Sequence, residues 1–368
     1  MKVDYLIVGA GFAGATVAEQ VVSKLNKKVL VVEKRNHIGG NCYDCYNDDG
    51  ILVQKYGPHI FHTSSKEVWD YLSRFTEWNN YVHRVISNVN GQEVYLPINL
   101  DTMEKLYGYR FTPEELQEYF NKKRVKLVSI KNSMDVIVSQ VGEELYDLFF
   151  KNYTKKQWGV YPEELDAQVT KRLPVRFNRD TRYFSDKYQG IPKHGFTRLF
   201  ENMLDHKNIQ IMLNTDYKDI INEVQYDQLI YTGPIDYFFD YKFGPLQYRS
   251  LEFKHETLDV EKYQNAAVVN YPNDNDYTRI TEFKQFYLQK HHKTTICYEY
   301  PLDTGEPYYP IPKQECLELY QKYRCEAEKI PNVNFIGRLA QYRYLNMDKV
   351  VEVAMDAADK IGSLCRRK

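Results

Sequence analysis

Three glycines near the start of the chain have the spacing of a loop that binds a nucleotide diphosphate. They lie in the segment Gly9-Ala10-Gly11-Phe12-Ala13-Gly14. In such a loop the first glycine permits a tight turn, the second lets the backbone approach a pyrophosphate, and the third lets helix and strand pack closely. The helix that follows offers unpaired N–H groups to the anion. The spacing therefore indicates a dinucleotide site.

The elements expected around this loop make the motif informative, because the glycine pattern alone is weak evidence. We expect a strand at 3–8, a helix from residue 12 to about 25, and a second strand at 28–32 that ends at Glu33. Glu33 lies 19 positions after Gly14 and would accept hydrogen bonds from ribose hydroxyls. The alternative, a tight turn without a ligand, is disfavoured by this order of elements.

Two later segments favour FAD over NAD as the dinucleotide. Residues 227–233 have the pattern of a strand that ends in Thr-Gly, and residues 334–336 have that of a strand followed by Gly-Arg. A helix with one apolar face is expected from about Asp348, a candidate N-cap, to Ile361. A second helix N-terminus suits the long flavin dinucleotide, whereas a terminal helix that only packs is the alternative interpretation.

If the strands near residues 5, 230 and 335 share one sheet, the segments between them are insertions. Residues 100–158 have helical character, with Thr112 as an N-cap and an apolar period of 3.6 residues over 132–150. Within 249–300, the alternation typical of strands is clearest at 268–271 and 294–298.

We therefore expect an α/β fold in which a Rossmann-like, two-part FAD-binding domain carries an inserted helical domain and an inserted antiparallel β-sheet domain. The expected bounds are 1–75, 192–240 and 320–368 for the FAD-binding domain, 96–165 for the helical insert, and 76–95, 166–191 and 241–319 for the β-sheet substrate domain.

Composition excludes several classes of function. Basic and acidic residues number 49 and 50, so no net charge favours nucleic acid or an anionic membrane. No run approaches the ~20 apolar residues of a membrane span. The N-terminus enters a strand pattern at once, so we expect no signal peptide, and the six cysteines are sparse for 368 residues. We expect a cytoplasmic protein. Tyrosine is unusually frequent at 33 residues.

Positive charge gathers in one segment. Residues 171–198 contain eight Lys or Arg and two Asp, a local excess of +6, together with Tyr183, Phe184 and Tyr188. Arginine can bind phosphate in a bidentate manner, so this segment suits a phosphorylated ligand. A solvated basic surface is the equal alternative.

A series of sequence motifs, spread along essentially the whole chain, resembles the motifs of a single protein family. They include the glycine loop, Ile38-Gly39-Gly40-Asn41, Tyr56-Gly57-Pro58-His59-Ile60-Phe61-His62-Thr63, Leu96-Pro97-Ile98-Asn99-Leu100, Lys156-Gln157-Trp158-Gly159, Thr232-Gly233-Pro234-Ile235-Asp236-Tyr237-Phe238, Tyr248-Arg249-Ser250-Leu251, Tyr277-Thr278-Arg279-Ile280-Thr281-Glu282 and Tyr342-Arg343-Tyr344-Leu345. In this order the chain resembles the bacterial UDP-galactopyranose mutases.

The resemblance implies a flavoenzyme that interconverts UDP-galactopyranose and UDP-galactofuranose without net redox change. In that family reduced FAD is the working form, and its N5 forms a covalent adduct with the sugar while UDP departs and returns. The cofactor rather than a side chain is then the nucleophile. The resemblance also implies an external reductant for the flavin, a role in cell-surface polysaccharide biosynthesis and a homodimer.

Site residues are carried over position by position from the same resemblance. The catalytic positions are Arg172, on a loop that closes over the diphosphate, Arg279, which stabilises the departing phosphate, His62 and Tyr344. The substrate contacts are Phe149, Tyr153, Thr154, Trp158, Tyr183, Asn270, Tyr309, His59 and Asn346. The cofactor contacts are Gly9, Gly11, Phe12, Gly14, Glu33, Lys34, Gly40, Asn41, His59, Ile60, Gly337, Arg338, Met347 and Asp348.

Some of these positions have simpler interpretations or depart from the family. His59 and His62 flank an apolar pair and could be hydrogen-bonded core histidines. Asn346 stands where many members carry Asp, which leaves its ligand role open. His83 stands where others carry Asn. Cys42-x-x-Cys45 lacks the second pair of a zinc site, so no metal is expected.

Three rival functions share some of these features. A flavin oxidoreductase of the amine-oxidase type would use the same nucleotide domain but lack phosphate-binding arginines in its substrate pocket. A non-catalytic UDP-sugar or FAD-binding module is disfavoured by Arg172 and Arg279. A nicotinamide-dependent sugar epimerase would lack a flavin absorption band.

Overall fold

The computed structural model describes residues 1–170 and 174–365 of the chain. Its centre is a parallel sheet of five strands in the order β16-β10-β1-β2-β9. These strands are β1 (Tyr5–Val8), β2 (Val29–Val32), β9 (Ile209–Met212), β10 (Gln228–Tyr231) and β16 (Val333–Phe335). The strands expected near residues 5, 30, 230 and 335 therefore share one sheet, which confirms the Rossmann-like fold, whereas β9 was not foreseen.

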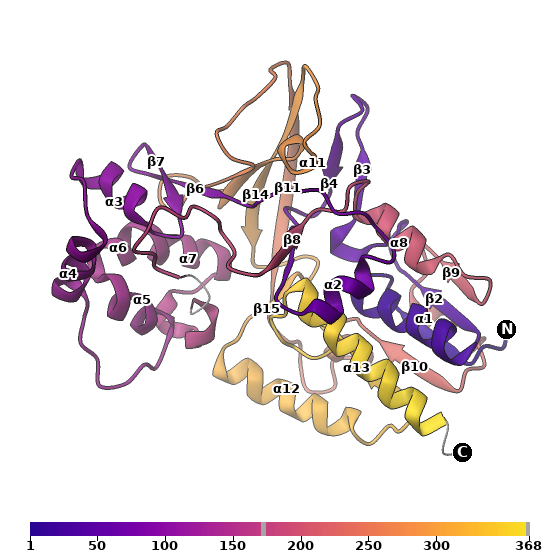
Figure 1. Ribbon diagram of the computed structural model, residues 1–368. Helices are drawn as coiled ribbons and strands as arrows, with labels where there is room; N and C mark the ends of the chain where they lie inside the picture. Colours follow the sequence, from indigo (N-terminus) through magenta and orange to yellow (C-terminus); the bar gives the residue numbers. More distant parts are fainter. Residues whose placement is uncertain (171–173, 366–368) are drawn as a thin grey trace.

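Three helices cover one side of this sheet, and two of them, α1 and α13, lie side by side (Figure 1). They are α1 (Phe12–Leu25), α8 (Phe196–Leu204) and α13 (Met347–Cys365). A group of buried phenylalanines fills the space beneath the glycine loop. The ring centroid of Phe12 lies 4.7 Å from that of Phe200 and 6.2 Å from that of Phe196.

The start of α13 differs from the sequence-based expectation. The helix begins at Met347, so Asp348 is its second residue and not its N-cap. Instead of capping the helix, the Asp348 side chain accepts a hydrogen bond of 3.1 Å from the Thr63 hydroxyl. Asn346 precedes the helix, and its backbone carbonyl accepts from the Val350 N–H at 3.0 Å.

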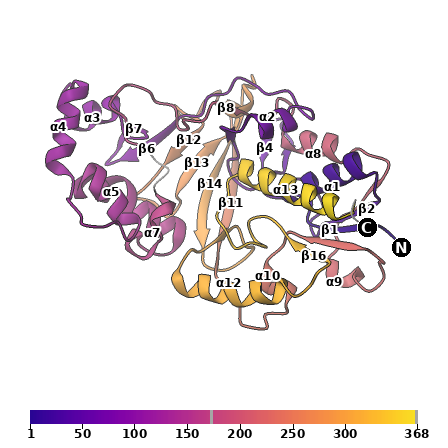
Figure 2. The ribbon, with the colours of Figure 1, turned by 60° about the horizontal axis from the view of Figure 1, so that its bottom comes forward.

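A second sheet of seven strands stands next to the first, in the order β15-β11-β14-β13-β12-β6-β7 (Figure 2). Its strands are β6 (Val85–Val89), β7 (Gln92–Leu96), β11 (Tyr248–Leu258), β12 (Val268–Asn270), β13 (Arg279–Glu282), β14 (Thr294–Leu302) and β15 (Tyr309–Pro310). All neighbouring strands are antiparallel except β6 and β12, which are parallel. The expected antiparallel sheet thus contains one parallel pair.

Helices gather at the far end of the second sheet (Figure 1). They are α3 (Leu100–Tyr107), α4 (Pro113–Lys123), α5 (Ser133–Val141), α6 (Glu143–Tyr146) and α7 (Asn152–Trp158), with a π-helical turn at Asp147–Lys151. Thr112 caps α4 as expected, since its side chain accepts from the Glu115 N–H at 3.2 Å. The period over 132–150 does not form one helix. It breaks at Gly142, where φ is +84° and an added Cβ would meet the Lys123 carbonyl oxygen at 2.6 Å.

Shorter elements connect these parts. They are β3 (Asp44–Tyr46), β4 (Leu52–Gln54), β5 (Phe61–Thr63), β8 (Tyr188–Gly190), α2 (Lys66–Leu72), α9 (Tyr217–Ile220), α10 (Ile235–Phe238), α11 (Lys284–Tyr287) and α12 (Gln314–Ala327). None of the helices in the described part of the chain has the length and apolar character needed to cross a membrane.

The phenylalanine group gives a test of this packing. Phe200 is fully buried against Phe12 and lies below Gly39. Phe200→Ala should lower the free energy of unfolding by about 3–5 kcal/mol, because the lost ring leaves a cavity. Chemical denaturation would measure the loss. Tyr46→Ala, at a side chain that is 65% exposed, should change it by no more than about 0.5 kcal/mol. Equal effects of the two substitutions would contradict this assignment of the core.

Candidate active site

A cavity of about 1130 Å³ opens where the strands of the parallel sheet end. Most of the residues expected to hold the cofactor line it. They are Gly9, Gly11, Phe12, Glu33, Lys34, Gly40, Asn41, His59, Gly337, Arg338 and Met347. Gly14, Ile60 and Asp348 were also expected there, but they lie behind the lining. The sequence motifs thus converge on one cavity from both ends of the chain.

The glycines of the first loop act in two different ways. At Gly14 an added Cβ would lie 1.9 Å from the carbonyl oxygen of Gly9, so this glycine is required by the packing of helix on strand. At Gly11 the nearest atom to an added Cβ would be the Cα of Gly40, at 3.6 Å, an ordinary contact. Gly11 therefore keeps space free at the cavity wall, as the approach of a pyrophosphate requires.

Glu33 is held at the rim of this cavity. Its side chain is buried, with one carboxylate oxygen accepting from the Ala10 N–H and the other from the Arg35 N–H, both at 3.0 Å. The next residue, Lys34, forms an ion pair with Glu306 at 2.6 Å, and Arg35 pairs with the same carboxylate at 2.6 Å. Lys34 thus lines the cavity while its ammonium joins the loop between β14 and β15 to the nucleotide-binding sheet.

One carboxylate close to this cavity has an oxygen atom without a partner in the described part of the chain. The Oδ1 atom of Asp348, near the start of α13, is buried without a hydrogen-bond partner among the described residues. Such an oxygen is costly, but Asp348 does not line the cavity, so this atom gives no evidence on the ligand. The residues that do line the cavity fit FAD, because Gly11 leaves space for a pyrophosphate, Glu33 offers a carboxylate and Arg338 a positive charge.

Arg338 forms the boundary between this cavity and an aromatic group on its other side. Its guanidinium carbon lies 5.3 Å from the ring centroids of both Tyr309 and Tyr344, and its Nε donates to the Leu345 carbonyl at 3.1 Å. Trp158 packs on the same two rings, with centroids 6.0 Å from Tyr309 and 5.4 Å from Tyr344. Three residues expected at the substrate are therefore brought together.

Arg279 lies in the same region, beside a buried carboxylate. Its Nε and Nη2 donate to the two oxygens of Glu299 at 2.9 and 2.7 Å. Burial alone would lower the pKa of Arg279, but Glu299 and the nearby Tyr153 and Tyr309 hydroxyls raise it well above its ordinary value. The guanidinium therefore stays charged, and its Nη1 donates to none of the described residues.

The tyrosines around Arg279 keep their protons at neutral pH. Burial, followed by the charge of Glu299, raises the pKa of Tyr309 to about 12. Burial also raises the pKa of Tyr153, against the opposing effect of Arg279. Both hydroxyls can therefore donate hydrogen bonds to an anion. Opposite Arg279 in the strand register, Asn270 has its Oδ1 buried without a partner among the described residues.

The two histidines of the first motif occupy different positions. His59 lines the cavity, and its Nδ1 lies 3.0 Å from the Gly57 carbonyl, so Nδ1 carries the proton. Burial lowers the pKa of His59 to about 4, and it stays neutral at pH 7. His62 pairs instead with Asp186 at 2.7 Å and stacks on Phe184. It does not line the cavity.

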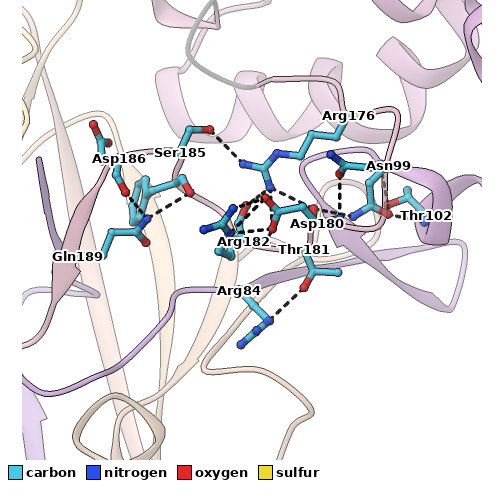
Figure 3. Close-up of polar contacts among 12 residues, drawn as sticks. Arg84, Asn99, Thr102, Arg176, Asp180, Thr181, Arg182, Ser185, Asp186 and Gln189 are labelled. Atoms are coloured by element: carbon cyan, nitrogen blue, oxygen red, sulfur yellow. Dashed lines mark hydrogen bonds and ion pairs between the residues drawn. The ribbon is translucent and has the colours of Figure 1, made fainter. Parts of the chain in front are cut away.

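The basic segment is largely bound to the protein itself (Figure 3). Arg176 donates to the carbonyls of Asp180 and Arg182 and to the Ser185 hydroxyl, and Arg182 pairs with Asp180 at 2.8 Å. The other ion pairs are Arg179 with Asp101 and Glu104, Lys193 with Glu77, and Arg198 with Glu201. The described part of this segment is therefore not a free cluster of phosphate ligands.

The remaining predicted substrate residues lie on two segments. Phe149 and Thr154 are buried around the start of α7, and Tyr183 packs edge-on against Phe184 and His83. Burial lowers the pKa of His83 to about 3, with Arg279 and His62 acting in the same direction. Asn346 precedes α13 and is half-buried. Arg172 lies outside the described residues.

Some residues of this region were missed by the sequence analysis. Glu299 lies in no motif noted above, and Lys156 lies in the motif at 156–159 but was given no role, because each contacts residues far away in the chain. Arg249 and Thr232 lie in motifs noted above but were given no role, although both line the cavity. A glutamate in the apolar strand 294–302 was the one available signal for Glu299.

Comparisons with known proteins agree with this geometry. Residues 148–344 match the family model described as UDP-galactopyranose mutase, and residues 7–75 match that of an NAD(P)-binding Rossmann-like domain. A probable UDP-galactopyranose mutase of Klebsiella pneumoniae is 42% identical over 98% of this chain and 95% of its own. A dTDP-fucopyranose mutase of Escherichia coli is 40% identical over 96% and 97%.

Solved structures show the same fold. The crystal structure of a reduced UDP-galactopyranose mutase superposes with a TM-score of 0.78 at 17% identity, covering 99% of this chain and 94% of its own. A putrescine oxidase bound to putrescine reaches 0.58 at 12% identity, with 99% of both chains covered.

The two glycines of the first loop offer a matched test of the cavity. Gly11→Ala should leave the free energy of unfolding within about 0.5 kcal/mol, because the added methyl has space, but should weaken dinucleotide binding. Gly14→Ala should destabilise the fold by about 1–3 kcal/mol or more, because its methyl overlaps the Gly9 carbonyl. Denaturation and titration of the apoprotein with FAD would separate these effects. Unchanged FAD affinity in Gly11→Ala would contradict the placement of the pyrophosphate.

Proposed function

The chain belongs to the UDP-galactopyranose mutase family, and we propose that it interconverts UDP-galactopyranose and UDP-galactofuranose on reduced FAD without net redox change. The observation that carries this proposal is the position of Arg338. It lines the cavity on one side and lies over the Tyr309 and Tyr344 rings on the other, and Arg279 lies close to Tyr309. When bound, reduced FAD would supply the nucleophile for the anomeric carbon.

Arg279 is suited to the departing diphosphate. Glu299 fixes two of its nitrogens, so the guanidinium cannot rotate, while Nη1 remains available to a phosphate oxygen. A preorganised donor of this kind stabilises charge that develops as the bond to the leaving group breaks. Tyr153 and Tyr309 would add neutral donors to the same anion, because their pKa values are raised.

The other predicted residues complete the proposed site. His62 stays a predicted catalytic residue, although its ring pairs with Asp186 outside the lining of the cavity. Asn270 would satisfy its unpartnered Oδ1 by accepting from a sugar hydroxyl. Phe149, Thr154 and Tyr183 would contact the nucleotide, and Arg172 would reach the diphosphate from its loop. We also propose an external reductant that keeps the flavin reduced, a cytoplasmic location and a homodimer.

A second candidate substrate deserves a direct comparison, because the dTDP-fucopyranose mutase is nearly as similar to this chain as the UDP-galactopyranose mutase. The two nucleotide sugars differ at the base, the ribose and the sugar C6. The residues proposed here would bind the part that the two molecules share, which is the diphosphate and the sugar ring.

The redox state of the flavin tests the function. Enzyme reduced with dithionite should convert UDP-galactofuranose to UDP-galactopyranose, and oxidised enzyme should be nearly inactive, because N5 is nucleophilic only in the reduced flavin. Chromatography of the products would measure both, with dTDP-fucofuranose as a parallel substrate. Faster turnover of dTDP-fucofuranose would replace the proposed substrate. Oxidation of an amine, or equal mutase activity in both redox states, would refute the mechanism.

Arg279→Ala tests the leaving-group role. It should lower kcat/KM by roughly 10²–10³-fold, as expected for loss of one preorganised electrostatic contact, while the absorption spectrum of bound flavin is unchanged. Arg84→Ala is the matched control, since Arg84 is exposed and its one hydrogen bond to the described residues goes to the Thr181 hydroxyl. Loss of flavin from the Arg279→Ala protein would assign that arginine to the fold instead.

A further inference from the structure

The side chain of Lys156, on helix α7, extends into the turn that joins β12 to β13. There it donates to the carbonyls of Tyr271, Asn275 and Tyr277 at 2.5, 2.7 and 3.1 Å. An ammonium has three N–H donors, so these three carbonyls take all of them. The side chain is therefore the internal support of the turn.

The two ends of this turn carry residues of the proposed site. Asn270 ends β12 and Arg279 begins β13, and the two are direct partners in the strand register. At the other end of the Lys156 side chain, α7 carries Tyr153, Thr154 and Trp158. The Lys156 side chain thus joins the helix of the proposed nucleotide contacts to the turn that presents Arg279, and the exposed Asn152 adds one bond of 3.1 Å to the Asn273 side chain.

A second side chain, from strand β11, also holds the end of helix α7. Arg249 on β11 donates to the backbone carbonyls of Lys156 and Gln157 at 3.0 and 3.2 Å, and Asp303 balances its charge. Asn273 in the turn also donates to the Leu148 carbonyl at 3.1 Å. The end of α7 is therefore held by both Arg249 and Lys156, and among the described residues Lys156 alone donates to three backbone carbonyls of the turn.

We propose that Lys156 is a positioning residue of the nucleotide-sugar site, which sets the place of Arg279 and Asn270 relative to the residues of α7. This inference rests on the proposed function for the roles of those residues, but the support of the turn is a property of the fold. Lys156 touches neither substrate nor cofactor in this scheme. It acts by holding helix α7 and the turn between β12 and β13, which form two walls of the site, at fixed positions relative to each other.

The charge of Lys156 makes this support sensitive to pH. Burial lowers its pKa to about 8, although Asp274 and Asp276 on the turn act in the opposite direction. The other charged group nearby is the Arg249 guanidinium, which contacts the Lys156 backbone. As pH rises through about 8 the ammonium loses one donor, and one carbonyl of the turn loses its partner.

Raising the pH above about 8 changes stability and activity in opposite directions. In the unfolded chain the lysine keeps its ordinary pKa of 10.5. Between about pH 8 and 10.5 the unfolded chain therefore binds the proton more strongly, and the Lys156 contribution to the free energy of unfolding rises with pH. A positioning role thus predicts that activity falls over this range while this contribution to stability increases.

The test compares Lys156→Met with Lys155→Met in the flavin-loaded enzyme. Lys155 is the adjacent exposed lysine, which among the described residues donates to the Gly159 carbonyl and lies over the Tyr161 ring. Lys156→Met should lower kcat/KM roughly ten- to a hundredfold, as expected when reacting groups are misplaced, while Lys155→Met remains near wild type. The wild-type profile of kcat/KM should decline above about pH 8, and this limb should be absent from Lys156→Met.

Hydrogen exchange provides a readout that requires no activity. The amides of Tyr271 and Thr278 pair with the carbonyls of Thr278 and Glu299, and both should exchange faster in Lys156→Met than in Lys155→Met. Unchanged exchange, or kcat/KM within about twofold of the control, would overturn the inference. A wild-type enzyme without activity on either nucleotide sugar would refute the proposed function alone, and exchange would still decide the role of Lys156.

Discussion

Parallel pairing among strands from distant parts of the chain is the constraint on which the rest of the structure depends. β1 pairs with β2 and β10, and β10 with β16, so strands from residues 5 to 335 share one sheet. Parallel strands end at the same edge, and ligands of such sheets bind there. Gly9, Glu33, Thr232 and Gly337 therefore meet, although more than three hundred residues separate the first from the last. The inserted segments leave and return at this edge, which places the second sheet and the helices around it.

The polar groups of the site are fixed by the protein before any ligand arrives. Glu299 holds Arg279, the Leu345 carbonyl holds Arg338, and the Gly57 carbonyl orients His59. Dipoles and charges that are already oriented need not reorganise during a reaction, which is the main source of electrostatic catalysis in proteins. A buried arginine would be costly without Glu299, so the pair also explains how a full positive charge persists next to aromatic rings.

The sequence predicts local features of this protein well and distant ones poorly. The glycine loop, the acid that ends β2 and the Thr112 cap depend on neighbours within a few residues, and the structure confirms each. Glu299 and Lys156 act on groups 20 and about 115–121 residues away, so no spacing rule could find them. The excess of positive charge over 171–198 suggested a phosphate site. However, basic side chains of this segment form ion pairs with Asp101, Glu104 and Glu77, which lie outside it. Net charge along the chain cannot show such pairs.

The aromatic packing gives the molecule a built-in optical reporter. The chain has three tryptophans, and two of them, Trp69 and Trp78, stack on each other at 4.4 Å near the nucleotide-binding sheet. Trp158 instead shares its surroundings with Tyr309 and Tyr344 at the boundary of the cavity. A molecule that enters among those rings contacts the Trp158 indole directly. The emission of Trp158 therefore responds to that entry, and it can be followed in time without a label.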